Sequence, residues 1–154
     1  MNIKIKRSSN PYRFFNREEK LKIIKAIQKA EKATSGEIRV HLERKSLGTV
    51  IERAKVIFER IGMAKTVQRN GVLIYIATVD HKFAILGDKG INEVVAEDFW
   101  TNVVSDLASH FKKNNFCEGI CNAIEKIGIK LKAYFPHQTN DKNELPDDIS
   151  IQDN

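Results

Sequence analysis

Residues 72–77 read Val-Leu-Ile-Tyr-Ile-Ala, and every one of them is apolar or aromatic. A run of this kind is typical of a central strand that is covered on both faces. Directly after it, Asp80 and His81 predict a tight turn, and residues 83–86 predict the returning strand of a hairpin. We therefore expect 72–77 to be the most buried strand, with the 83–86 strand as one neighbour.

The other neighbour is predicted from the stretch before it. Ile38, Val40 and Leu42 alternate with polar residues, which indicates a strand with one buried face. Before, between and after the strands, apolar residues recur at the spacing typical of helices. Three capping-box pairs mark the predicted starts of helices: Asn16 with Glu19, Thr49 with Glu52, and Asn115 with Glu118. The predicted order is α-β-α-β-β-α-α. Because a strand–helix–strand unit gives a parallel pair and a hairpin adds an antiparallel one, we expect a small mixed sheet with helices packed against it.

The length of 154 residues suits one domain. We place it at residues 14–136, after an N-terminal extension over 1–13 and before an acidic tail over 137–154. The tail carries a net charge of −4, which leaves +10 on the rest of a chain whose total is +6. Because the tail has almost no apolar residue and no periodicity, we predict that it is disordered.

Several classes of protein are disfavoured by the sequence. Residues 1–15 lack the apolar run of a signal peptide, and no segment approaches the length of a membrane span, so the expected location is the cytoplasm. Neither dinucleotide nor P-loop motifs occur, so no nucleotide cofactor is expected. No nucleic-acid-binding motif accompanies the basic charge.

Cys117 and Cys121, four residues apart, are too few for a disulfide framework and are interpreted as small buried hydrophobes.

Three segments taken together suggest a family. They are Lys-Ala-Thr-Ser-Gly-Glu-Ile-Arg-Val at 32–40, Asn-Gly-Val-Leu-Ile-Tyr at 70–75, and Lys-Phe-Ala-Ile at 82–85 leading into Gly-Asp-Lys-Gly-Ile at 87–91. In this order and spacing the chain resembles the TPM domain over about residues 14–135. The resemblance implies an α/β/α sandwich with a Rossmann-like look. It also implies several activities, since some members are linked to acid phosphatase activity, some to divalent metal and others to membrane-protein assembly.

The turn Gly87-Asp88-Lys89-Gly90 is the segment most suggestive of a site. If the hairpin returns beside the first strands, Asp88 lies near the start of the 38–42 strand, where other oxygen ligands follow. Carboxylate and amide oxygens are the ligands that Ca²⁺ and Mg²⁺ prefer. The candidate metal ligands are Glu37, Asn70, Asp88, Glu93, Glu97 and Asp98. The alternative is that these are solvated acids at helix starts, and that the glycines serve a turn with positive φ.

The sequence identifies no catalytic residue, so it leaves open whether the chain is an enzyme. His41, on the polar side of its strand, is interpreted as a structural histidine. Three functions stay in consideration: a non-catalytic module that binds a protein partner or aids assembly, a metal-dependent acid phosphatase, and a basic binder of nucleic acid or membrane surfaces. Of these, the absence of any catalytic constellation in the sequence favours the binding module.

Overall fold

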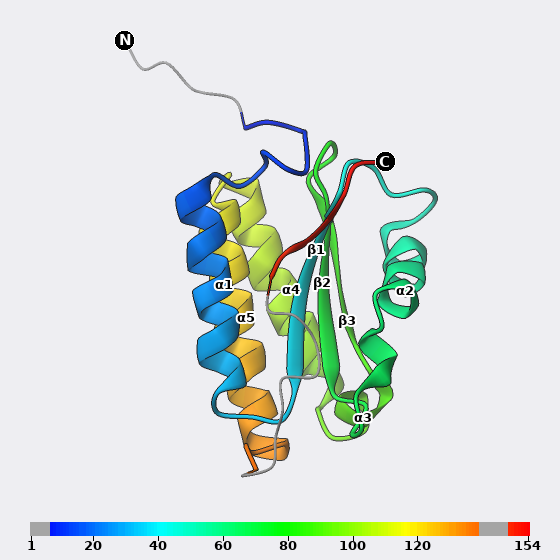
Figure 1. Ribbon diagram of the computed structural model, residues 1–154, viewed down its shortest axis with the longest axis vertical. Coiled ribbons are helices and arrows are strands. Elements are labelled where there is room, and N and C mark those ends of the chain that lie inside the picture. The colour runs from blue at the N-terminus through cyan, green and yellow to red at the C-terminus, as the bar shows by residue number, and fades with distance from the viewer. Residues whose placement is uncertain (1–6, 139–147) are drawn as a thin grey trace.

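The computed structural model describes residues 7–138 and 148–154 (Figure 1). Its helices and strands follow the predicted order, with three short elements added. In chain order they are α1 (Arg17–Glu31), β1 (Glu37–Glu43), α2 (Val50–Arg60), the 3-10 helix η1 (Met63–Lys65), β2 (Gly71–Ala77), β3 (Lys82–Gly87), α3 (Lys89–Asn92), α4 (Glu97–Lys112), α5 (Phe116–Tyr134) and β4 (Ser150–Gln152).

The four strands form one mixed sheet in the order β3-β2-β1-β4. β1 runs parallel to β2, and β2 runs antiparallel to β3. β2 therefore pairs on both sides, and all seven of its residues are buried. This confirms the prediction that 72–77 is the central strand, because a segment apolar on both faces is stable only where both faces are covered.

The sheet separates two cores. α1, α4 and α5 cover one face, and α2 lies against the other (Figure 1). The larger core includes Val40, Ile74 and Ile127, whereas the smaller one joins Phe58 of α2 to Tyr75 of β2. The chain is thus an α/β/α sandwich, as the sequence predicted.

Local signals for helix starts have mixed outcomes. Asn16 and Glu19 form the predicted capping box, with both reciprocal hydrogen bonds present. Thr49 accepts a hydrogen bond from the backbone of Glu52. The prediction for Asn115 is wrong, since its side chain makes no capping hydrogen bond. Its backbone, with φ −94° and ψ 61°, departs from the extended conformation that a capping residue usually has.

The glycines of the 87–90 turn have a different role from the one expected. Neither of them has a positive φ. At Gly90 a Cβ atom would lie 2.1 Å from the carbonyl oxygen of Gln68 and 2.6 Å from that of Arg69. Glycine is needed here because another backbone segment approaches closely.

The tail prediction is wrong for Ser150–Gln152, which form β4 along the outer side of β1 (Figure 1). The preceding Ile149 is 8% exposed and belongs to the larger core, which explains why this segment orders. The part of the predicted tail at 139–147 lies outside the described residues. At the other end, Phe14 is 1% exposed, so the expected domain start at residue 14 falls on a core residue.

Candidate functional site

The outer side of β1 is a sheet edge on which the segment 148–154 is seated. β4 runs parallel to β1, with His41 opposite Ser150 and Glu43 opposite Gln152. An exposed strand edge offers unpaired backbone groups and is a natural template for an added strand. Here that template holds a segment more than a hundred residues away in the sequence.

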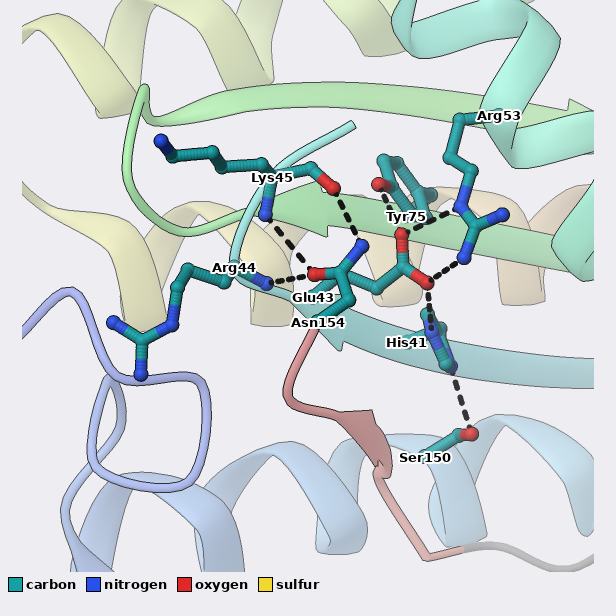
Figure 2. Close-up of polar contacts among 8 residues, drawn as sticks. All are labelled: His41, Glu43, Arg44, Lys45, Arg53, Tyr75, Ser150 and Asn154. Carbon is teal, nitrogen blue, oxygen red and sulfur yellow. Dashed lines mark hydrogen bonds and ion pairs between the residues drawn. The ribbon is translucent and has the colours of Figure 1, made fainter. Parts of the chain in front are cut away.

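A buried ion pair lies beneath this edge, on the side of the sheet that α2 covers (Figure 2). Glu43 is completely buried, and Arg53 of α2 binds both of its oxygens, with Nε–Oε2 at 2.9 Å and Nη2–Oε1 at 2.7 Å. The Tyr75 hydroxyl donates a third hydrogen bond to Oε2 at 2.7 Å. The alternating pattern of β1 predicted one buried face only, and this is wrong because the network shields the polar face as well.

Burial and hydrogen bonding act in opposite directions on the pKa of Glu43, but the hydrogen bond to Glu43 acts in the same direction as burial on the pKa of Tyr75. Burial alone would raise the pKa of Glu43, but the hydrogen bonds from Arg53 and Tyr75 outweigh it and hold that pKa below its usual value. Burial, together with the hydrogen bond to a carboxylate, raises the pKa of Tyr75. At neutral pH the network therefore consists of a carboxylate, a guanidinium and a neutral phenol.

His41 connects this network to β4. Its side chain is 2% exposed, its Nδ1 lies 2.8 Å from Ser150 Oγ, and its Nε2 lies 3.6 Å from Glu43 Oε1 (Figure 2). Its ring stacks on Tyr75 with centroids 6.0 Å apart. Burial lowers the pKa of His41 to about 4, so the ring is neutral at neutral pH. If the neutral ring carries its proton on Nε2, on the side of the carboxylate, the Ser150 hydroxyl is the donor to Nδ1.

Ser150, His41 and Glu43 follow one another in a chain of polar contacts, and this order calls for comparison with a catalytic triad. Arg53 and Tyr75 already occupy the Glu43 oxygens, and the low pKa makes His41 a weak base. The ring itself is almost wholly buried. This arrangement does not activate Ser150 as a nucleophile, and the prediction of a structural role for His41 is consistent with its contacts.

A second set of contacts holds the end of the segment. Arg44 binds Asp153 in a bidentate pair, at 2.7 and 3.0 Å. The Asn154 side chain accepts hydrogen bonds from the backbone N–H groups of Arg44 and Lys45, and donates one to the carbonyl of Lys45 (Figure 2). The edge of β1 and the residues after it thus contact both the backbone and particular side chains of the segment 148–154.

Three of the candidate metal ligands come to one end of the sheet. Glu37 pairs with Gly71, and the backbone N–H of Asp88 donates to the Gly71 carbonyl at 2.9 Å. Asn70, next in the chain, is 1% exposed and its amide donates to Ser35 and Gln68. The remaining candidates are exposed: Glu93, Glu97 and Asp98.

The Asp88 carboxylate already has cationic and backbone partners. Arg69 binds both of its oxygens, at 2.6 and 2.8 Å, and the N–H of Lys89 donates to Oδ1. Within residues 7–138 and 148–154, no three His, Cys, Asp or Glu side chains are grouped to hold a metal ion. A cation at Asp88 would have to displace the Arg69 guanidinium, so these residues as arranged do not fit a metal, and the cation site stays a prediction.

The comparison with known families agrees with this fold. The family model of the TPM domain matches residues 9–129, most of the described chain. The chain belongs to the TPM-domain family. A solved structure of the BA42 protein from the psychrophilic bacterium Bizionia argentinensis is 47% identical, with a TM-score of 0.85, over 90% of this chain and 96% of that one.

A second solved structure, with a much lower sequence identity, supports the architecture alone. The N-terminal domain of the cg2496 protein from Corynebacterium glutamicum has a TM-score of 0.60 at 12% identity, over 76% of this chain and 74% of that one. No curated protein matches the sequence. Among the described helices, none has the length and apolar character needed to cross a bilayer.

Sequence reasoning missed the Glu43–Arg53–Tyr75 network and the docking of β4. One signal for the network was present, since Glu43 lies two residues after His41 and hence on the same face of the strand. One signal for the strand was the alternation of Ile149 and Ile151 within an otherwise acidic stretch.

Proposed function

We propose that this TPM domain is a non-catalytic binding module whose β1 edge accepts an extended acidic peptide of a protein partner as an added strand. The observation that carries the proposal is the seating of residues 148–154 on that edge. Recognition by strand addition draws affinity from main-chain hydrogen bonds and specificity from alternate side chains. The segment 148–154 is then a ligand that the domain carries in its own chain.

The chemistry of the seated segment defines the partner. Ile149 packs into the larger core, and Ile151 packs against it. Asp153 binds Arg44, and the charge of Asp148 acts on Arg39. The partner peptide therefore has apolar residues at alternate positions and acidic residues at its flanks.

The strength of the seating is compatible with exchange. Only three residue pairs join β4 to β1. The Arg44–Asp153 pair is about a third exposed on both sides, and exposed ion pairs contribute little to stability because water screens them. A partner peptide with better contacts can replace the segment, although the segment has the advantage of a high effective concentration.

The other functions expected from the sequence stay predictions. A metal-dependent phosphatase would need the Asp88 carboxylate, which Arg69 occupies at the end of the sheet where Glu37 and Asn70 also lie. A basic binder of nucleic acid or membrane surfaces rests on the net charge alone. The edge of β1 offers a more specific arrangement than either.

The test is binding of a fluorescein-labelled peptide with the sequence of residues 147–154 to the full chain, followed by anisotropy. Ile149→Asp weakens the seating of the chain's own segment, because burying an isoleucine contributes about 1.5–3 kcal/mol. We expect this variant to bind the peptide at least about tenfold more tightly than the wild type does. A second change, Arg44→Glu, should remove that gain by repelling Asp153 of the peptide.

Two controls define the outcome. A scrambled peptide of the same composition should not bind, and Val67→Asp, at a side chain that is 87% exposed, should behave as the wild type. Circular dichroism establishes that each variant is folded. A folded Ile149→Asp variant that leaves the anisotropy of the peptide unchanged would overturn the proposal.

A further inference from the structure

A groove with a volume of about 920 Å³ runs between α1 and α5. Small side chains line it, among them Ala26 and Gly128. Cys117 and Cys121 line it as well, and the expectation that both are buried hydrophobes is wrong, since each is only partly buried. The lining includes no residue of β1 or of the segment 148–154, so the groove is separate from the edge described above.

The two helices run side by side in the same direction (Figure 1). Near the start of the groove, the Cys117 thiol donates to the backbone carbonyl of Glu19, with Sγ and the oxygen 3.7 Å apart. About three turns further on, a Cβ atom on Gly128 would lie 2.8 Å from Ala30 Cβ. Both contacts join residues whose numbers differ by 98, so α1 and α5 keep one register along the groove.

The two rims of the groove carry opposite charges. Lys22 and Lys29, seven residues apart, lie on the α1 rim. Glu118 and Glu125, also seven residues apart, lie on the α5 rim. All four side chains are exposed, and within residues 7–138 and 148–154 none of them forms an ion pair. Each rim thus offers two charges, two helical turns apart, to a partner.

The other charged residues of the lining leave this pattern intact. Glu19 on α1 is bound by Arg7 at 2.8 Å. Lys132 on α5 is level with Thr34 in the same register, which is three residues beyond the end of α1. No part of α1 is therefore level with Lys132.

Rims of opposite sign restrict the occupant of the groove. An anionic ligand would be attracted by the lysines and repelled by the glutamates across the groove, and a cationic ligand would meet the reverse. A second copy of the chain carries both signs in the same spacing. In a two-fold interface each contact occurs twice, with the roles of the two copies exchanged, so one arrangement can satisfy both rims.

We propose that the chain forms a two-fold dimer through this groove, with the lysines of each copy opposite the partner's glutamates. An axis parallel to the helices places α1 of one copy on α5 of the other, in the same direction. With the register above, Lys22 then lies two positions, or about 3 Å along the axis, from the level of the partner's Glu118. Lys29 has the same relation to the partner's Glu125. An axis across the helices would place α1 on α1 and bring the lysines together.

Ile129 adds an apolar contact to this interface. Its side chain lies on the α5 rim and is 62% exposed. In the same register it is two positions from the level of Ala33, which lines the groove from the end of α1. Association therefore removes apolar surface from water as well as pairing charges.

Sedimentation equilibrium of the full chain, from micromolar to millimolar concentration, measures the association. We expect the mass of the wild type to rise toward that of a dimer. The acidic variant, Lys22→Glu with Lys29→Glu, should associate at least about tenfold more weakly, because like charges then face each other. The basic variant, Glu118→Lys with Glu125→Lys, should be weakened to a similar extent.

Mixing the two variants distinguishes a second copy from any other occupant. Both rims are negative in the acidic variant and both are positive in the basic variant, so a mixed pair has opposite charges at every contact. An equimolar mixture should therefore form dimers, although each variant alone does so poorly.

The matched control is Lys25→Glu with Lys32→Glu. These two exposed lysines have the same spacing on the α1 side but do not line the groove, so the control should associate as the wild type does. Circular dichroism establishes that each variant is folded. A wild type that stays monomeric at millimolar concentration would overturn the proposal and leave the groove to a different occupant. A mixture of folded variants that fails to associate, or a control as weak as the acidic variant, would overturn it as well.

Discussion

Arg69 and Asp88 form a bidentate ion pair at the end of the sheet, with Arg69 Nε 2.6 Å from Asp88 Oδ2 and Nη2 2.8 Å from Oδ1. The Asp88 carboxylate also caps the first turn of α3 through the N–H of Lys89. Arg69 thus stands where a cation bound to Asp88 would be. Its guanidinium supplies the positive charge that a metal ion would otherwise bring.

The first prediction is that removing this guanidinium strengthens any response to divalent cations. In Arg69→Ala, Asp88 keeps Glu37 and Asn70 at the same end of the sheet but has no side-chain cation. We expect millimolar Ca²⁺ or Mg²⁺ to raise the melting temperature of Arg69→Ala more than that of the wild type, because binding to the native state stabilises it by mass action.

Asp88→Ala is the matched control, and the cation response should vanish in it. A shift of equal size in Arg69→Ala and Asp88→Ala would place the cation elsewhere on the protein. Absence of a shift in all three proteins would refute the metal site predicted from the sequence.

The central strand and the layers were predictable because their signals are local. Residues 72–77 are apolar at every position, and only a doubly covered strand suits that pattern. Asn16 and Glu19 complete their capping box within four residues. β4 has only the alternation of Ile149 and Ile151 as a local signal, and three residues are too few to establish a period. Its position depends on a register with β1 that only long-range packing of Ile149 and Ile151 selects.

The second prediction concerns the seated segment. Deleting residues 148–154 should lower the free energy of unfolding by about 1–2 kcal/mol, because the burial of Ile149 is lost while the entropy of ordering the segment is regained. Exposed positions without special contacts change stability by at most about 0.5 kcal/mol. Urea denaturation measures the difference. A deletion as stable as the wild type would show that the segment is seated without net stabilisation.

The third prediction concerns the buried ion pair. Arg53→Met keeps much of the side-chain volume but leaves Glu43 buried with only the Tyr75 hydroxyl as a strong donor. Breaking a buried pair on one side typically costs about 3–5 kcal/mol, and the remaining hydrogen bond places this variant near the lower value. Thermal or urea unfolding measures the loss.

Its control is the exposed pair between Lys55 and Glu52 on the same helix, with side chains 61% and 70% exposed. Lys55→Met should change stability by less than about 1 kcal/mol. The double variant Arg53→Met with Glu43→Gln should recover part of the loss, since no buried charge is then left unpaired. Equal losses in the single and double variants would argue against a charge effect.

The site was less predictable than the fold for a physical reason. Alternation in β1 places Glu43 and His41 on one face, but it does not say which helix covers that face. The partner of Glu43 is Arg53, ten residues later on α2, and the third member is Tyr75 on another strand. A pairing of this kind depends on tertiary packing. The sequence also did not identify Arg69 as the side chain that binds both oxygens of Asp88.

The fourth prediction is a loss of stability in mild acid that arises from His41. Its pKa is about 4 in the folded protein and about 6.5 in the unfolded chain, so the unfolded chain binds more protons between these values. The contribution of His41 to the free energy of unfolding therefore has its full value above about pH 6.5. It decreases by roughly 3 kcal/mol in all as the pH drops toward 4. Glu43 has a lowered pKa, so its own contribution is lost only in stronger acid.

The variant His41→Gln isolates this effect, because glutamine fills the site without taking up a proton. We expect the wild type to lose stability steadily from pH 6.5 to 4.5 in urea titrations, while His41→Gln stays nearly level over that range. The deletion of 148–154 should reduce the slope as well, since removing β4 exposes the ring and allows its pKa to rise toward the ordinary value. Parallel curves for the wild type and His41→Gln would mean that His41 is not the group that titrates.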